Sequence, residues 1–104
     1  MAYFKIKGAI PPMITPFNEN GEVDFEKHVR NIQDWNNYDL AGYLVLGSNS
    51  ETVYLTEDEK IKLVELTVKY RKPGKLVIAG TGMESTSATI DLTNKAADLG
   101  ADCA

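Results

Sequence analysis

The sequence predicts an α/β protein with parallel strands in the element order β-α-β-α-β-α-β. Two short apolar segments, 42–47 and 76–79, lack polar alternation, which is typical of strands buried on both faces. Strand starts near residues 42, 75 and 101 lie roughly 30 residues apart, the length of a βαβ crossover unit. Two architectures accept such units: a (β/α)8 barrel and an open doubly wound sheet.

The first βα unit is predicted from a proline-bounded apolar segment and a capped helix. Residues 9–15 hold apolar side chains among prolines, so we expect a short first strand there. The cluster 18–21 predicts a turn, and Asp24 can cap a helix that ends at about Asn36 or Asn37. The apolar face of that helix repeats at helical spacing and comprises Phe25, Val29, Ile32 and Trp35.

The second and third units follow the same plan. A polar loop, 48–55, leads to Thr56 and Glu59, whose spacing predicts a capping box at the start of a helix. The Pro-Gly pair at 73–74 ends this helix. After the strand at 76–79, Ser85 can cap a third helix, which Gly100 ends. Residues 101–104 predict the start of a fourth strand.

Composition excludes several classes of protein. The chain has 104 residues, 11 basic and 15 acidic, and its net charge of -4 argues against nucleic-acid and membrane partners. A lone Cys103 cannot form an internal disulfide, and no apolar run approaches the roughly 20 residues that span a bilayer. The start, 1–7, does not resemble a secretory signal peptide. We therefore expect a cytoplasmic protein, or a mitochondrial one if a presequence has been removed.

The richest candidate site follows the second strand. In both architectures ligands gather at the carboxyl ends of the strands. There, Ser48 and Asn49 offer a hydroxyl and an amide, donors that suit a small carboxylate or phosphate. The alternative is a polar turn whose side chains cap their own backbone.

A weaker candidate follows the third strand, where 80–85 partly matches a glycine-rich phosphate loop. The third glycine is replaced by Ser85, and the acidic residue expected about 20 residues later to hold a ribose would fall near Asp102, at the start of a strand. We favour a tight strand-to-helix turn and keep a doubly wound nucleotide- or phosphate-binding module as an alternative. His28 has no second metal ligand nearby and is interpreted as a surface or half-buried structural histidine; Cys103 is interpreted as an inert thiol.

Taken in order, several segments resemble the amino-terminal third of the dihydrodipicolinate synthase / N-acetylneuraminate lyase family. The segment after the second strand is the most specific. The segments are 8–17 (GAIPPMITPF), 47–51 (GSNSE), 55–59 (LTEDE), 77–82 (VIAGTG), 85–86 (ST) and 99–102 (LGAD).

The resemblance implies that 1–104 is the amino-terminal portion of a single (β/α)8 barrel domain, commonly assembled as a dimer of dimers. It implies a carbon-carbon lyase, aldolase or synthase that holds pyruvate or a 2-oxo acid as a Schiff base on a lysine, without a metal or organic cofactor. Ser48 and Asn49 would bind the substrate carboxylate, and Ser48 would also serve catalysis in a hydroxyl relay. The serine-asparagine pair, together with 83–86 (MEST), is more similar to the 4-hydroxy-2-oxoglutarate aldolase branch than to synthases with two threonines. A family member without catalytic activity is a further alternative.

Three further expectations depend on this resemblance. The chain's lysines fall on predicted helices or their ends, so no Schiff-base lysine is present and the segment alone should be inactive; they include Lys60, Lys62, Lys69, Lys72, Lys75 and Lys95. The family usually has glycine at the position of Ser50, which would be strained if the backbone there needs positive φ. Tyr54 and Leu55 match a stretch near a dimer contact and are expected to serve assembly.

Overall fold

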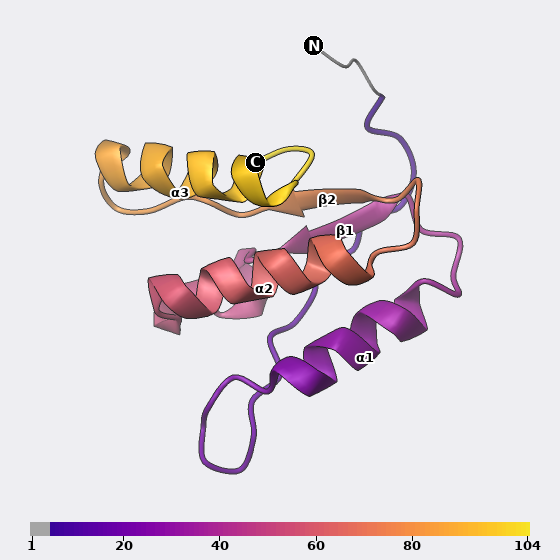
Figure 1. Cartoon of the computed structure of the whole chain (residues 1–104), viewed down its shortest axis with the longest axis horizontal. Helices are drawn as coiled ribbons and strands as arrows, with labels where there is room; N and C mark the ends of the chain where they lie inside the picture. The colour runs from indigo at the N-terminus through magenta and orange to yellow at the C-terminus, as the bar shows by residue number, and fades with distance from the viewer. Residues whose placement is uncertain (1–4) are drawn as a thin grey trace.

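The computed structural model describes residues 5–104, so the expectation about the start of the chain falls partly outside the described residues. Three helices alternate with two regular strands, and two 3-10 turns follow the first strand (Figure 1). The elements are α1 (Phe25–Trp35), β1 (Gly42–Val45), η1 (Ser48–Ser50), η2 (Thr52–Tyr54), α2 (Glu57–Tyr70), β2 (Leu76–Ala79) and α3 (Thr86–Leu99).

The strands are parallel and lie side by side in chain order. β1 pairs with β2 in parallel, with Leu44 opposite Ile78. Parallel bridges extend this sheet on both sides, from Pro12 to Leu44 and from Ile78 to Cys103. A doubly wound sheet places its fourth strand on the far side of the first, whereas a barrel keeps strands in sequence order. The observed order is that of a barrel.

The first predicted strand, 9–15, is not a regular strand. It pairs with β1 through one bridge and two backbone hydrogen bonds, Leu44 N to Pro11 O (3.1 Å) and Met13 N to Leu44 O (2.8 Å). A third bond joins Ala41 N, just before β1, to Ala9 O (2.8 Å). Pro11 and Pro12 have no N–H to donate, so the ladder is interrupted. The segment nevertheless lies beside β1 and runs parallel to it, as the sequence predicts.

All three helices pack on one face of the sheet. In Figure 1 they lie side by side with α2 in the middle. Tyr43, Val45, Val77 and Ala79 face the helices and are buried. The alternate residues Leu44, Leu76 and Ile78 are only half-buried, because no helix covers their face. In a closed barrel that uncovered face is the interior, filled by side chains of the other strands.

The helix ends confirm the predicted caps. Asp24 accepts a hydrogen bond from Lys27 N, and Ser85 accepts one from Ala88 N. Thr56 and Glu59 form both bonds of the capping box. Gly100 ends α3 with a φ of 105°, a left-handed conformation that glycine adopts without steric cost.

His28 differs from its prediction, because its side chain is only 1% exposed. It lies between α1 and α2, with Nε2 2.8 Å from Thr67 Oγ1. Thr67 donates its single hydroxyl proton to Leu63 O at 2.7 Å, so it accepts from His28 Nε2–H. Burial lowers the pKa of His28 to about 4. A neutral histidine therefore joins the two helices.

Candidate functional site

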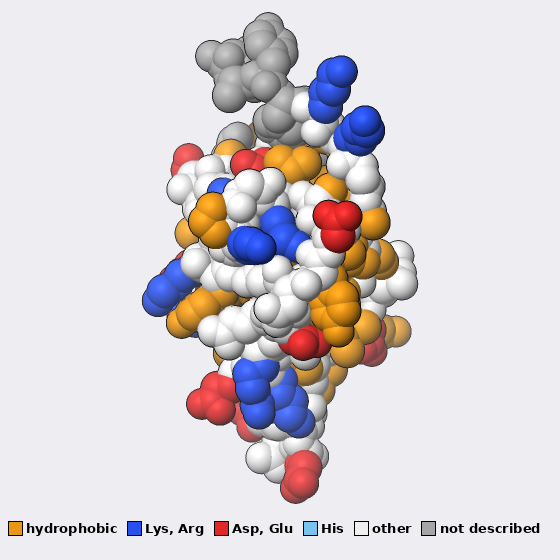
Figure 2. Space-filling model, turned by 90° about the vertical axis from the view of Figure 1, so that its right-hand side faces the viewer, with side chains coloured by type: hydrophobic (Ala, Val, Ile, Leu, Met, Phe, Trp, Pro, Cys, Tyr) orange, Lys and Arg blue, Asp and Glu red, His pale blue; other side chains and the backbone are white. Residues whose placement is uncertain are grey.

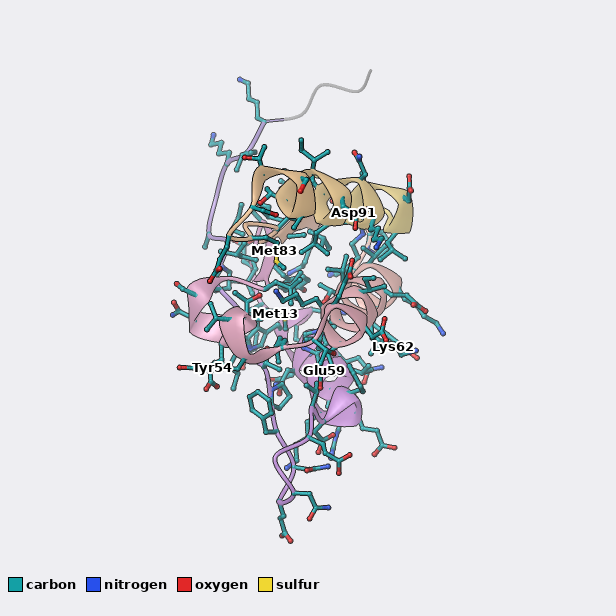
Figure 3. The ribbon with its side chains drawn as sticks, turned by 90° about the vertical axis from the view of Figure 1, so that its left-hand side faces the viewer. Met13, Tyr54, Glu59, Lys62, Met83 and Asp91 are labelled. Carbon is teal, nitrogen blue, oxygen red and sulfur yellow. The ribbon has the colours of Figure 1, made fainter. Side chains whose placement is uncertain are left out.

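The carboxyl ends of β1 and β2 lie at the same end of the molecule as the amino-terminal ends of α2 and α3 (Figure 1). Figure 3 looks onto this end and shows Met83 between α3 and the 3-10 turns, with Tyr54 at the outer margin. The opposite end carries basic and acidic side chains scattered among one another (Figure 2). No helix of the described residues combines the length and apolarity needed to cross a membrane.

Ser48 and Asn49 are exposed at this end, on the turn that follows β1. The turn is closed by its backbone, with Ser50 N donating to Gly47 O (2.9 Å) and Glu51 N to Ser48 O (3.1 Å). Neither the Ser48 nor the Asn49 side chain forms a hydrogen bond to any of residues 5–104, and no side chain caps η1. Both side chains are therefore available to a ligand, in contrast to a turn that caps itself.

The turn is bracketed by two non-glycine residues in the left-handed conformation. Leu46 has a φ of 64° and Glu51 a φ of 56°. A bulky residue such as leucine rarely adopts positive φ, and such positions cluster at functional sites. Ser50 would be strained only if its φ were positive. It lies in a 3-10 turn and its φ is not positive, so this strain is absent.

Ser50 has a role that the sequence did not reveal. Its side chain is 1% exposed, and its hydroxyl donates a hydrogen bond to the carbonyl of Met13. This bond connects the turn after β1 to the first strand segment. Its partner is a backbone atom 37 residues away, so no local pattern could have indicated it.

The loop after β2 engages its hydroxyls within the fold. Thr93 donates to Thr89 O (2.7 Å), so its oxygen accepts the hydroxyl of Thr81 (2.7 Å). Thr89 Oγ1 accepts from Met83 N (2.9 Å), and Ser85 caps α3. The segment 80–85 is thus a tight strand-to-helix turn, as the sequence predicts.

A hollow of about 590 Å³ lies between this loop, η2 and α2. Lys60 lines it, is 5% exposed and places Nζ 3.2 Å from Met83 Sδ. Its other lining residues are Thr52, Val53, Gly82, Met83, Glu84, Ser85 and Ala88, so neither Ser48 nor Asn49 lines it. Lys60 belongs to α2, and no lysine among residues 5–104 lies in β1 or β2. Within the same residues, no three His, Cys, Asp or Glu side chains gather as a metal site.

Comparison with known proteins identifies the family. The family model described as "Dihydrodipicolinate synthetase family" matches residues 5–104. The chain belongs to this family. A 4-hydroxy-tetrahydrodipicolinate synthase of Bacillus velezensis is 42% identical over 91 residues, which cover 88% of this chain and 32% of the relative. The corresponding enzyme of Coxiella burnetii (strain RSA 493 / Nine Mile phase I) is 34% identical over 98 residues, covering 93% and 34%.

Solved structures share the fold. The dihydrodipicolinate synthase of Aquifex aeolicus superposes with a TM-score of 0.88 at 38% identity, covering 94% of this chain and 33% of that one. A 2-keto 3-deoxygluconate aldolase of Picrophilus torridus gives the same TM-score at 24% identity, a likeness of fold alone, and covers 95% and 35%. The chain spans about a third of the length of these relatives. Its α/β fold is the amino-terminal part of a (β/α)8 barrel.

Proposed function

We propose that the full-length protein is a carbon-carbon lyase, aldolase or synthase acting on pyruvate or another 2-oxo acid through a lysine Schiff base. The observation that carries the proposal is the pair of unengaged donors, Ser48 and Asn49, at a strand end of a synthetase-family barrel. A carboxylate accepts hydrogen bonds from both a hydroxyl and an amide. In barrel enzymes this end of the strands is where active sites form.

The proposed chemistry assigns distinct tasks to the lysine and to the donors. The lysine amine attacks the substrate ketone and water leaves, so that an imine forms. The protonated imine accepts the electron pair as a carbon-carbon bond breaks beside it, and the reverse flow forms that bond. Ser48 and Asn49 hold the carboxylate, which makes imine formation intramolecular in effect. Ser48 would also pass a proton through its hydroxyl. No organic cofactor or metal is required by this scheme.

The lysine is proposed to lie outside the present chain, since β1 and β2 contain none. The segment 1–104 is accordingly proposed to be inactive alone. Treatment of the full-length protein with pyruvate and borohydride should reduce the imine and leave one pyruvate-derived group on a lysine, detectable by mass spectrometry. Absence of that adduct would contradict the lyase mechanism and favour a family member without catalysis.

The second substrate divides the proposal into two branches. Relatives named 4-hydroxy-tetrahydrodipicolinate synthase favour a synthase. The Ser48-Asn49 pair favours the 4-hydroxy-2-oxoglutarate aldolase branch. Release of pyruvate from 4-hydroxy-2-oxoglutarate by the full-length protein would support the aldolase, and lack of release beside a positive borohydride adduct would support the synthase.

Assembly of the full-length protein is proposed to involve η2. Tyr54 is 79% exposed at the outer margin of the 3-10 turns, which suits a subunit contact in a cytoplasmic dimer of dimers (Figure 3). Leu55 does not share this role, because it is 8% exposed and belongs to the core between the sheet and α2. Light scattering of a Tyr54→Asp variant should show smaller particles than the unchanged protein.

A further inference from the structure

The end of the pairing between the first segment and β1 leaves one carbonyl to be satisfied. Leu44 N donates to Pro11 O, and Met13 N donates to Leu44 O. In a regular parallel ladder the next donor, to Met13 O, would be the N–H of Leu46. Leu46 has a φ of 64°, and no backbone N–H of residues 5–104 donates to Met13 O. The hydroxyl of Ser50 takes this place.

The Ser50 hydroxyl thus replaces a backbone hydrogen bond of the ladder, and it does so from the same turn that carries the candidate donors. Ser50 belongs to η1 together with Ser48 and Asn49. It is buried, whereas the two donors are exposed. The hydroxyl thus joins the turn to the neighbouring strand segment, while the donors remain directed to solvent.

The other side of the turn is fixed by close backbone packing. A Cβ at Gly80 would lie 2.2 Å from Leu46 O and 3.2 Å from Gly47 N. Gly80 N also donates to Val45 O at 2.8 Å. The turn is therefore held by the first segment through Ser50 and by β2 through Gly80.

We propose that Ser50 is a positioning residue that holds Ser48 and Asn49 in the geometry that binds the carboxylate of a pyruvate-type substrate. This inference rests on the proposed function. The Ser50 hydroxyl is occupied by Met13 O and does not touch the substrate. Its contribution is preorganisation, because a turn held in its binding geometry loses less conformational entropy when the ligand binds.

The test measures borohydride trapping of the full-length protein across a range of pyruvate concentrations, for the unchanged protein and for Ser50→Ala. The half-saturating pyruvate concentration should rise roughly three- to tenfold, the range set by one net hydrogen bond. The trapping rate at saturation should change less than about twofold on the same scale. Ser50→Cys, which keeps a weak donor, should restore part of the difference. Ser87→Ala, at an exposed serine of α3, is the matched control and should leave both quantities unchanged.

An unchanged half-saturating concentration in Ser50→Ala would overturn the inference, even if the thermal unfolding midpoint falls, because a purely structural role lowers stability alone. Lack of trapping in the unchanged protein would instead remove the proposed function and this inference with it. Should Ser50→Ala fail to fold, Ser50→Cys decides: an increased half-saturating concentration supports the inference and an unchanged one overturns it.

Discussion

The turn after β1 and the loop after β2 look alike in sequence, since both place hydroxyl side chains and glycine at a strand end. They differ in what their polar groups do. Around the loop after β2, Thr81, Ser85 and Thr89 are engaged with α3 or its first turn. In the turn after β1, Ser48 and Asn49 are exposed and make no side-chain hydrogen bond to a described residue.

This difference separates a structural cap from a candidate binding site. A hydroxyl that already satisfies a helix end gives up a bond when a ligand competes for it. A donor without a protein partner loses only its hydrogen bonds to water when a ligand binds. Under the proposed function, ligand binding belongs to the β1 end and helix anchoring to the β2 end, and each role can be tested by mutation.

The largest effect is expected from the free donors themselves. In the full-length protein, Ser48→Ala and Asn49→Ala should each lower the efficiency of pyruvate trapping roughly 10- to 100-fold, because hydrogen bonds to a charged carboxylate contribute about 1.5–3 kcal/mol. Borohydride trapping at several pyruvate concentrations measures this. Unaltered trapping in both variants would place the carboxylate elsewhere.

The close approach between the two strand ends predicts the next effect. Gly80→Ala should lower the free energy of unfolding by about 1–3 kcal/mol, because the new Cβ would lie 2.2 Å from Leu46 O. Gly82→Ala is the matched control in the same loop: its Cβ would meet nothing within 4 Å, so the change should stay within about 0.5 kcal/mol. Urea denaturation of the full-length protein compares them, and equal effects would contradict the packing described here.

Acid pH should destabilise the helix layer without altering either strand end directly. His28 has a pKa of about 4 when folded and an ordinary value of 6.5 when unfolded, because burial disfavours its charge. Between these values the unfolded chain binds more protons, so stability falls as pH falls. Between pH 7 and pH 5 the free energy of unfolding should fall by about 2 kcal/mol because of His28.

A His28→Gln variant isolates this contribution in the full-length protein. Gln can still donate to Thr67 but does not titrate, so its unfolding free energy should decrease less between pH 7 and pH 5. Denaturation at the two pH values measures the difference in slope. Identical slopes would show that His28 titrates with its ordinary pKa in the folded state.

The smallest effect is expected from the helix cap after β2. Ser85→Ala removes the bond to Ala88 N and should cost about 1 kcal/mol of stability. Pyruvate trapping should stay at the unchanged level, because the Ser85 hydroxyl serves α3. If Ser85→Ala lowered pyruvate trapping although the protein remained folded, the proposed division between the two strand ends would be contradicted.

The sequence was sufficient for features with local or periodic causes. The caps at Asp24, Thr56 and Ser85 follow from side chains that reach backbone groups three residues away. The buried strands β1 and β2 follow from apolar runs without alternation. The first strand was less predictable, because the prolines that marked its position also prevent a regular ladder.

Features that depend on distant partners were not predictable in the same way. Ser50 donates a hydrogen bond to the carbonyl of Met13, and His28 donates one to the hydroxyl of Thr67. Both partners are brought close only by the folding of the chain. The left-handed Leu46 has no signal in residue type, since leucine disfavours that conformation. The location of Ser48 and Asn49 at a strand end was predictable, but their lack of competing hydrogen bonds required the structure.

The most direct measurement is a crystal structure of the full-length protein after reduction with borohydride in the presence of pyruvate. We predict a covalent group on a strand lysine, with its carboxylate about 3 Å from Ser48 Oγ and the Asn49 amide nitrogen. A carboxylate bound away from both side chains would contradict the assignment of the turn after β1 as the substrate site.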